Sequence, residues 1–356
     1  MELSALYLPQ FHAIPENDLW WGEGFTEWAN VKKAQPLFRG HRQPVIPGEL
    51  GYYNLLDPTV RERQAELARL HGVTSFCYWH YWFGGRQLLE RPFEEVLTTH
   101  SPSLPFFLGW ANQSWSGIWH GAPQRILMEQ TYPDGDDQRH FDHLLRAFRD
   151  DRYVHLGGRP VLMIFCPADL PNPRAFVDRW QTMARTAGLD GLYLVAWIEG
   201  RDWGVNYATH EADGFDAGLY VHFPFARSWR TKVRDRLRAR DERFGPVRYP
   251  YCDDLPLPRV PLAGVLHPSV QPNWDNTPRS ERRGAVALNG SPERFCRHLT
   301  QALAREQLRD ADHQLCVVKS WNEWAEGNYL EPDERFGRGW LEAVRDARRA
   351  NGIATP

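Results

Sequence analysis

Short apolar runs recur along the chain, and each is followed later by a stretch in which apolar positions repeat with the period of a helix. The runs predict strands at Leu3–Leu8, Ser75–Trp79, Phe106–Trp110, Pro160–Phe165, Leu192–Trp197, Phe215–Val221, Ala263–His267 and Leu315–Ser320. The periodic stretches predict helices at Pro58–His71, Asp136–Asp150, Pro173–Ala187, Pro292–Gln307 and Gly337–Ala350. Proline opens three of these helices, where its missing N–H costs little, and glycine follows two of them.

Strands that alternate with helices predict parallel βαβ units, and eight strands are most simply arranged as a closed (β/α)8 TIM barrel, an α/β fold. The strands are almost wholly apolar, which fits a sheet covered on both faces. A doubly wound open sheet is the alternative. However, the turn after the first strand, Leu8-Pro9-Gln10-Phe11, lacks the glycine-rich phosphate cradle that is typical of that fold. We therefore expect residues 1–356 to form a single barrel domain.

The connection between the first strand and the first helix, residues 9–57, is long for a compact domain. Loops of that length are usually functional. It mixes aromatic and acidic side chains, namely Trp20, Trp21, Glu23, Glu27 and Trp28. We therefore predict that residues 9–57 form an active-site loop.

The net charge of −3 is close to neutral, which argues against a nucleic-acid partner. The arginine-rich segment Arg227–Arg243 is interrupted by acidic residues, so we interpret it as a solvated helix face, with a polyanion site as the lesser alternative.

The five cysteines, at positions 77, 166, 252, 296 and 316, include no close pair, which favours buried free thiols in a reducing compartment. No apolar run approaches the length of a membrane span, and the chain begins almost directly with a strand rather than with a signal sequence. The sequence therefore predicts a cytoplasmic location, unless a leader has been trimmed.

Polar and aromatic residues gather where the predicted strands end, and this is the end at which barrels carry their active sites. The chain has 16 tryptophans, and indole rings pack well on the C–H faces of sugars, so the mixture favours a carbohydrate cleft. A plain structural role is the alternative for His80, which can satisfy a strand end, and for Asp275 and Asn276, which can cap a turn. The predicted substrate-binding residues are Tyr7, Gln10, Trp21, Glu27, Tyr78, His80, Tyr81, Trp110, Asn112, Gln113, Trp274, Asp275, Asn276, Trp321 and Asn322.

Glu323 and Glu326 follow the last predicted strand and are the strongest catalytic candidates. If the chain turns helical there, the two side chains share a face, with Cβ atoms roughly 5–6 Å apart. Each carboxylate raises the pKa of the other, so one can hold a proton while its neighbour is ionised, as glycosidic cleavage requires. An acidic helix start is the alternative. The flanking Trp321 and Trp324 favour the catalytic interpretation.

Other chemistries find little support in the sequence. The histidines are scattered and there is no H-E-x-x-H or paired cysteine motif, so we expect no metal site. No G-x-S-x-G elbow is present, because Asn289-Gly290-Ser291-Pro292 does not match it.

Seven motifs together resemble the WbsX-type proteins, domains similar to glycoside hydrolase family 99. They are Tyr7-Leu-Pro-Gln-Phe-His12, Trp20-Trp-Gly-Glu-Gly-Phe-Thr-Glu-Trp28, Gly51-Tyr-Tyr53, Phe76-Cys-Tyr-Trp-His-Tyr-Trp82, Trp110-Ala-Asn112, Trp274-Asp-Asn-Thr277 and Trp321-Asn-Glu-Trp-Ala-Glu-Gly327. The resemblance runs from about Leu3 to the final helix. It implies a (β/α)8 barrel with an endo-α-mannosidase-like site and no cofactor.

The resemblance also implies a retaining mechanism through a 1,2-anhydro sugar. In that mechanism Glu323 would assist deprotonation of the sugar 2-hydroxyl, and Glu326 would be the general acid and then the base for water. One departure concerns the third strand, where many WbsX-type chains have Asn-Glu-Asn-Trp and this chain has Asn112-Gln113-Ser114-Trp115. An amide replaces a carboxylate there, which puts the substrate sugar in doubt.

Three functions remain open from the sequence. The first is a retaining endo-type glycoside hydrolase that acts on a bacterial surface or secreted glycan. The second is a glycosyltransferase of polysaccharide assembly, a label that members of this group also carry, although Asp134-Gly135-Asp136 is better interpreted as a turn than as a nucleotide-sugar motif. The third is a non-catalytic carbohydrate-binding barrel.

Overall fold

The computed structural model describes residues 1–117, 122–201, 204–225, 235, 245–254, 258 and 261–354. Within these residues, parallel strands form a closed barrel from β1 (Glu2–Tyr7), β2 (Ser75–Phe83), β4 (Phe106–Trp110), β8 (Arg159–Ile164), β9 (Tyr193–Arg201), β11 (Ala217–Val221), β13 (Val265–Val270) and β15 (Leu315–Val318). Each barrel strand pairs with the next one along the chain, and β15 pairs with β1 from Glu2↔Leu315 to Ala5↔Val318, which closes the barrel. The eight predicted strands and the (β/α)8 fold are confirmed.

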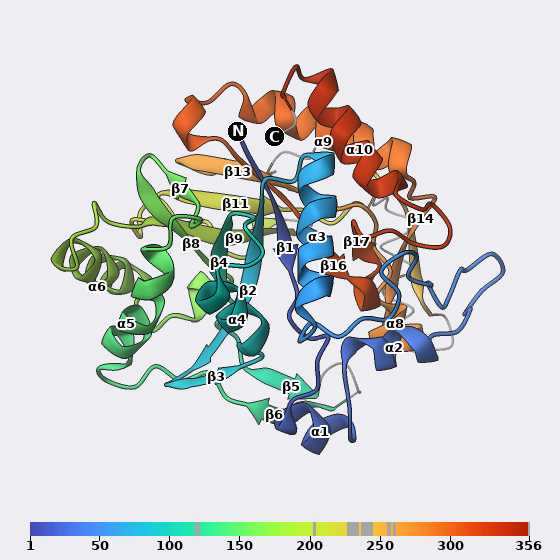
Figure 1. The fold of residues 1–356 in the computed structure, drawn as a ribbon, viewed down its shortest axis with the longest axis horizontal. Helices are drawn as coiled ribbons and strands as arrows, with labels where there is room; N and C mark the ends of the chain where they lie inside the picture. Colours follow the sequence, from blue (N-terminus) through green and yellow to red (C-terminus); the bar gives the residue numbers. More distant parts are fainter. Residues whose placement is uncertain are drawn as a thin grey trace.

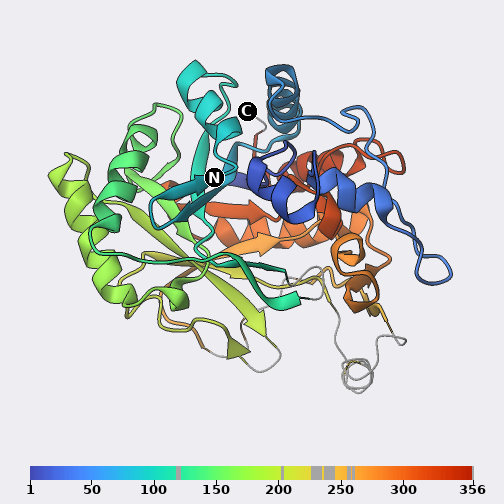
Figure 2. The same cartoon turned by 90° about the horizontal axis from the view of Figure 1, so that it is seen from below.

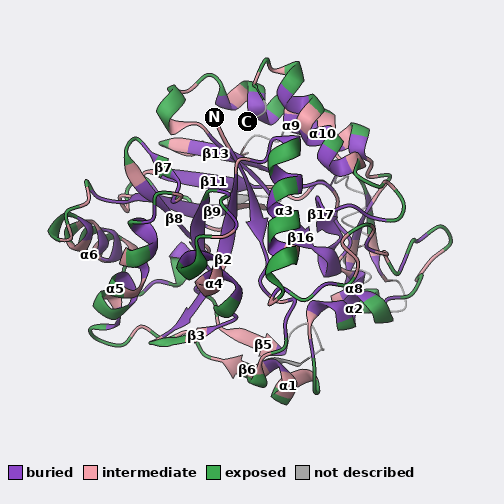
Figure 3. Cartoon of the chain, in the orientation of Figure 1, coloured by how far each residue is buried: buried purple, intermediate pink, exposed green. Residues whose placement is uncertain are grey.

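Helices surround this barrel (Figure 1), namely α3 (Pro58–His71), α4 (Arg91–Thr99), α5 (Asp136–Phe148), α6 (Pro173–Thr186), α9 (Pro292–Glu306) and α10 (Gly339–Ala350). The five predicted helices are confirmed to within two residues at each end, and α4 was not predicted. Side-chain oxygens of Asp57, Asn172 and Ser291 accept hydrogen bonds from backbone N–H groups at the starts of α3, α6 and α9. The helices turn buried faces to the strands and exposed faces outward (Figure 3).

The two faces of β2 show how the barrel sorts its side chains. Successive side chains of a strand point to opposite faces. Trp79 packs on Phe165 and Trp197 inside the barrel, whereas Tyr78 packs on Phe93 of the surrounding helix α4. The strand runs to Phe83, four residues past its predicted end. This extension carries Tyr81 above the barrel.

Gly109 of β4 makes room for the interior ring of Trp79. A Cβ atom at this position would lie 2.6 Å from Met163 Cε and 3.3 Å from both Cys77 Sγ and Trp79 Cε3. A larger residue would therefore clash with the Met163 side chain first and would also crowd the indole of Trp79.

Several short elements extend the barrel. The long connection after β1 contains α1 (Pro15–Trp21) and α2 (Glu27–Lys33), and a hairpin of β5 (Trp115–Gly117) and β6 (Ala122–Met128) follows β4. These elements and α8 (Thr277–Ser280) lie together in the lower part of Figure 1, and Figure 2 gives a second view of them. The last barrel strand leads into β16 (Asn322–Glu323), the 3-10 turn η6 (Trp324–Glu326) and β17 (Asn328–Tyr329). The remaining short elements are β3 (Arg86–Leu88), β7 (His155–Leu156), β10 (Gly204–Val205), β12 (Val247–Pro250), β14 (Ala285–Leu288), η2 (Pro167–Asp169), η4 (Glu281–Arg283) and η5 (Ala311–His313).

Three further sequence-based expectations concern the arginine-rich segment, the cysteines and membrane-spanning segments. Apart from Asp235, the predicted solvated helix Arg227–Arg243 lies outside the described residues. All five cysteines are free thiols, as predicted. Cys77 and Cys316 are buried, but Cys166, Cys252 and Cys296 are only half-buried, so the prediction of buried thiols was wrong for these three. None of the helices in the described part of the chain is long and apolar enough to cross a membrane.

Candidate active site

A cleft of about 380 Å³ opens among the loops at the carboxyl ends of the barrel strands. Six aromatic side chains line it: Trp21, Phe25, Trp79, Tyr81, Trp115 and Phe165. Its polar lining consists of Gln10, Glu27, Asn30, Gln113, Ser114, Ser116, Arg279, Lys319, Glu323 and Glu326. A mostly apolar wall with a few converging polar groups is the usual composition of a small-molecule site.

Glu323 and Glu326 lie on the short hairpin that follows β15. Glu323 ends β16, and Glu326 ends the single 3-10 turn η6. The predicted helical turn is therefore present, although it is tighter and shorter than an α-helix. The Glu326 carbonyl oxygen accepts a 2.6 Å hydrogen bond from the Asp275 backbone N–H, which ties this turn to the loop after β13.

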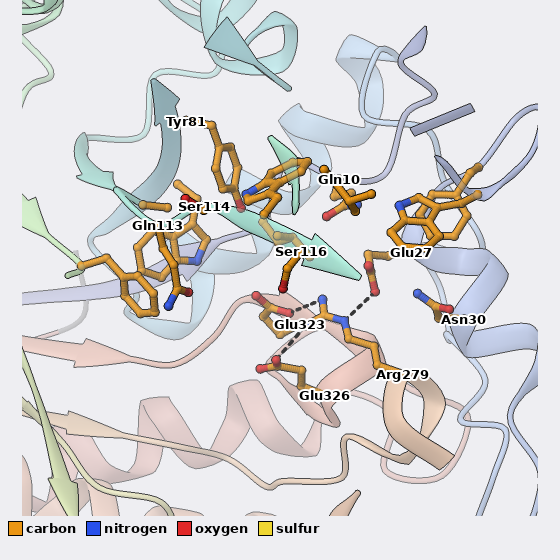
Figure 4. A pocket seen from close by; sticks show the side chains of 18 of the residues that line it. Gln10, Glu27, Asn30, Tyr81, Gln113, Ser114, Ser116, Arg279, Glu323 and Glu326 are labelled. Atoms are coloured by element: carbon orange, nitrogen blue, oxygen red, sulfur yellow. Dashed lines mark hydrogen bonds and ion pairs between the residues drawn. The ribbon is translucent and has the colours of Figure 1, made fainter. Parts of the chain in front are cut away.

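Arg279 of α8 lies between the two glutamates and Glu27 (Figure 4). Its Nη1 donates to Glu326 Oε1 at 2.7 Å, and its Nη2 donates to Glu323 Oε2 at 3.0 Å. Its Nε donates to Glu27 Oε2 at 3.0 Å. Because the two candidate catalytic carboxylates bind the two terminal nitrogens of one guanidinium group, they lie close together.

Lys319 is a second cation in the site, and it forms a hydrogen bond to Glu326 but not to Glu323. Its Nζ donates to Glu326 Oε2 at 2.9 Å, so both oxygens of Glu326 are bound by positive charges. Asn328 Nδ2 also approaches Glu326 Oε2, at 3.3 Å. The surroundings of the two glutamates are therefore unequal.

This inequality separates the pKa values of the two carboxyl groups. Burial, together with the neighbouring Glu326 and Glu27 charges, outweighs Arg279 and Lys319 and raises the pKa of Glu323 to about 7. For Glu326 burial acts in the same direction, but Lys319 and Arg279 outweigh it and lower its pKa to about 2. The site thus holds one carboxyl group that keeps a proton near neutral pH beside one that is ionised.

Glu331 stabilises the hairpin through hydrogen bonds to its buried carboxylate. Its Oε1 accepts hydrogen bonds from Gln64 Nε2 at 2.6 Å and Trp321 Nε1 at 3.0 Å. Its Oε2 accepts from the Tyr53 hydroxyl at 2.8 Å and from Trp324 Nε1 at 2.6 Å. A single buried carboxylate thus fixes both tryptophans that flank Glu323, and it ties them to α3 and to the long loop after β1.

Of the residues predicted from the sequence, seven line the cleft, and they come from β2 and from the segments after three other barrel strands, β1, β4 and β15. These residues are Gln10, Trp21, Glu27, Tyr81, Gln113, Glu323 and Glu326. The Gln113 side chain is exposed in the cleft, at the position where the resembling family has a carboxylate.

Ten of the predicted residues do not line this cleft, and five of these point from the barrel strands or the last hairpin into packing layers. The Tyr7 hydroxyl donates to Gln64 Oε1 at 2.6 Å, and Tyr78 packs on Phe93. His80 Nε2 faces His140 Nε2 at 2.9 Å, and burial lowers its pKa to about 3. Trp110 packs against Trp180 of α6, and Trp321 donates to Glu331. Alternate positions of a strand face opposite sides, so these side chains face away from the cleft.

The other five residues hold loops together. Asn112 Oδ1 accepts from Cys166 N at 2.7 Å, and Asn322 Oδ1 accepts from Leu8 N at 2.8 Å, so each amide joins the ends of two strands. Asn276 Oδ1 accepts from Ala285 N at 2.8 Å. The remaining two are Asp275, whose Oδ2 accepts from His41 Nε2 and Gln43 Nε2, both at 2.8 Å, and Trp274, which packs on Phe223 and Phe225.

Sequence reasoning missed Arg279, Lys319, Asn30 and Trp79 as parts of the site. Arg279 stands two residues beyond the motif that ends at Thr277, and a charged residue so close to a buried motif was an available signal. Lys319 was a second signal, because it is a lone cation at the end of an apolar strand. Among the described residues no cluster of three or more histidine, cysteine, aspartate or glutamate side chains is placed to hold a metal ion.

The fold resembles that of known carbohydrate-active enzymes. A protein described as glycoside hydrolase-like shares a TM-score of 0.62 at 12% identity, over 97% of this chain and 93% of that chain. A GH99 endo-alpha-mannosidase from Bacteroides thetaiotaomicron shares a TM-score of 0.57 at 13% identity, over 99% of each chain. At these identities the similarity concerns the fold.

Sequence comparisons identify the family. Two proteins described as "Uncharacterized protein WxcX", from strains B100 and ATCC 33913 of Xanthomonas campestris pv. campestris, are each 39% identical to this chain over 358 residues. The matches cover 99% of this chain and 50% of each relative, so the chain spans about half the length of the curated relatives it matches. The model of the family described as Glycosyltransferase WbsX matches residues 3–344. The chain therefore belongs to the WbsX family.

Proposed function

We propose that this chain is a retaining glycoside hydrolase that cleaves a bond within a bacterial polysaccharide or oligosaccharide, in an endo-acting, α-mannosidase-like manner. The proposal rests on the pair Glu323 and Glu326. These two buried carboxyl groups accept hydrogen bonds from one guanidinium group, that of Arg279, and their pKa values are shifted in opposite directions. General acid and base catalysis of glycoside cleavage needs one protonated and one ionised carboxyl group side by side.

The chemistry follows from that division of charge. The protonated carboxyl group donates its proton to the glycosidic oxygen, which leaves as an alcohol with the electrons of the broken C1–O bond. The ionised partner serves the bond that forms at C1, either as the nucleophile or by taking the proton of the sugar 2-hydroxyl, as the resemblance to family 99 implies. Water then enters at C1 and returns a proton to the first carboxyl group.

The aromatic lining supports a sugar as the bound molecule. Trp115 packs edge-on against Tyr81 and Trp20 with ring centroids 5.0 and 5.9 Å away, so its indole is held rigidly at the cleft wall. Gln10, Asn30 and Gln113 offer amide groups to hydroxyls. A neutral sugar fits these groups.

Trp115→Ala is expected to raise KM roughly three- to tenfold with little change in kcat, because a stacking platform binds the ground state and the transition state alike. Steady-state kinetics on the preferred glycan measure both constants. Ile126→Ala on the facing strand of the same hairpin is the matched control, since Ile126 is 58% exposed and does not line the cleft. A fall in kcat with an unchanged KM would contradict the platform role.

A glycosyltransferase of surface-polysaccharide synthesis is the second candidate, because the family description carries that word. This function requires a nucleotide-sugar donor, so it predicts saturable binding of nucleoside diphosphate sugars. Calorimetric titration with a panel of such donors tests it. A non-catalytic binding barrel would instead bind glycans equally well with either glutamate replaced.

The deciding experiment is a screen of bacterial polysaccharides and α-mannosides, read by mass spectrometry of released oligosaccharides. Wild-type protein should release oligosaccharides from at least one glycan, and Glu323→Gln and Glu326→Gln should release none. Nucleotide-sugar binding together with no release from any glycan would replace the hydrolase by the transferase.

A further inference from the structure

Lys319 occupies an unusual place for a lysine side chain. It follows β15, and its backbone N–H donates to Val270 O at 2.8 Å, so its main chain is fixed to the neighbouring barrel strand. Its Nζ lies 2.9 Å from Glu326 Oε2 and 5.0 Å from the ring centroid of Trp274. The ammonium group is thus held between a carboxylate and the face of an indole, both of which favour its charged form.

The indole ring of Trp274, on which the Lys319 ammonium group packs, is itself held in place. It is 6% exposed and is packed edge-on by Phe223 at a centroid distance of 4.6 Å. Trp274 was predicted from the sequence to bind substrate, but it does not line the cleft, and the ammonium group of Lys319 lies over its ring. A rigid ring limits the positions that Nζ can take.

The two glutamates differ mainly in their access to this lysine. Glu326 has one oxygen on Arg279 and the other on Lys319, whereas Glu323 is bound to Arg279 through Oε2. Among the described residues, Glu27 and Tyr81 also lie close enough to interact electrostatically with the pair, and the nearby Asp275 is paired with His41. The cluster contains three carboxyl groups, those of Glu27, Glu323 and Glu326, and two cations, Arg279 and Lys319. Its net charge is −1 when all three carboxyl groups are ionised, so a single added proton makes it neutral.

We propose that Lys319, held on the face of Trp274, is the positioning residue that keeps Glu326 ionised and thereby leaves the proton of the pair on Glu323. The inference rests on the proposed function of the two glutamates. It makes Glu323 the general acid, the reverse of the division that the family resemblance implies. The leaving oxygen then departs with the proton of Glu323 and the electrons of the C1–O bond, while Glu326 receives the proton of the hydroxyl that forms the new bond to C1.

A titration that needs no substrate tests this assignment. Protein labelled with carbon-13 at the glutamate side-chain carboxyl is followed by NMR between pH 3 and 9, and the two signals are assigned with Glu323→Gln and Glu326→Gln. In the wild type the Glu323 signal should titrate near neutral pH and the Glu326 signal should stay that of a carboxylate. In Lys319→Met the titration midpoint of Glu326 should rise by at least about one pH unit and by more than that of Glu323, because Lys319 lowers both pKa values but hydrogen-bonds only to Glu326.

Lys32→Met is the matched control, because Lys32 Nζ also lies over an aromatic ring, that of Tyr52 at 4.3 Å, but Lys32 does not line the cleft. It should leave both titrations unchanged. Trp274→Leu keeps the lysine but removes the indole on which its ammonium group packs. It should therefore shift the titration midpoints of Glu323 and Glu326 in the same directions as Lys319→Met, but by less. If Lys319→Met does not fold, Lys319→Gln provides the same loss of charge with a hydrogen-bonding group in place.

Two outcomes would overturn the inference: unchanged midpoints in the lysine variants, or a wild-type Glu326 that titrates above Glu323. Neither depends on finding a substrate, so failure here is distinct from failure of the glycan screen. Where a glycan is cleaved, the basic limb of the wild-type pH profile of kcat/KM should lie near pH 7, and Lys319→Met should move it to higher pH, because the loss of a cation makes the last proton of the pair harder to remove. A merely structural lysine would lower activity at every pH alike.

Discussion

Replacing Glu323 by glutamine is expected to lower kcat/KM for a glycan with a sugar leaving group by roughly 10²–10⁴-fold, the usual contribution of a general acid. Glutamine keeps the size and the hydrogen-bonding capacity of the side chain but cannot supply a proton. An aryl glycoside with a good leaving group needs little protonation, so its cleavage should be largely retained. Steady-state rates on the two substrates, compared as a ratio, measure this effect.

Glu326→Gln should instead lower the rate on both substrates by a similar factor, since its ionised form serves the bond that forms at C1. Glu23→Gln is the matched control, because Glu23 is an exposed glutamate of the same long loop as Glu27 and does not line the cleft. It should be indistinguishable from wild type. If Glu326→Gln were the variant that spares the aryl glycoside, the division implied by the family resemblance would hold and the roles proposed for the pair would be exchanged.

Replacing Glu331 by leucine is expected to lower the free energy of unfolding by about 3–5 kcal/mol. Four buried donors, from Gln64, Tyr53, Trp321 and Trp324, lose their acceptor. Glu331→Gln keeps one acceptor oxygen and should cost less, about 1–3 kcal/mol. Scanning calorimetry of wild type, both variants and Glu334→Gln, an exposed glutamate in the same loop, measures the falls in Tm. If Glu331→Leu had the same Tm as the Glu334→Gln control, these hydrogen bonds would contribute little to the stability of the fold.

The pH dependence of Tm offers a second check on Glu331. Burial is the larger effect and raises the pKa of this carboxyl group from its ordinary 4.5 to about 7, although its four donors act in the opposite direction. Between those two pH values the folded protein therefore binds more protons than the unfolded chain, and stability falls as pH rises. Glu323 contributes in the same direction. Glu331→Gln should flatten this fall in part, whereas Glu334→Gln should leave its slope unchanged.

The barrel could be predicted from the sequence because its strands are short, continuous apolar runs separated by helices with clear starts. The position of the Glu323–Glu326 turn was also predictable, since it follows the last strand. What the pattern could not give was the direction of each side chain in β2. Both faces of that strand are buried, so period-two alternation does not say whether Trp79 or Tyr78 points inward.

The ion pairs of the site could not be predicted from the sequence for a related reason. Arg279 is 44 residues from Glu323 along the chain, and it reaches Glu27 across 252 residues. Such contacts depend on how α2, α8 and the last hairpin come together above the barrel. Residue types alone suggested a proton-sharing pair, but the position of the proton depends on Lys319.

The hairpin from Trp321 to Glu331 combines the two carboxyl groups proposed to be catalytic with the hydrogen bonds made by Glu331, and under that proposal there is a consequence for how the protein can be altered over generations. A substitution in this segment is selected against twice, once through the rate and once through the abundance of folded protein. The rim formed by α1 and the β5–β6 hairpin is free of that double penalty. New glycan preferences should therefore arise first on the rim, and laboratory libraries that aim at other sugars should randomise the rim and leave the hairpin intact.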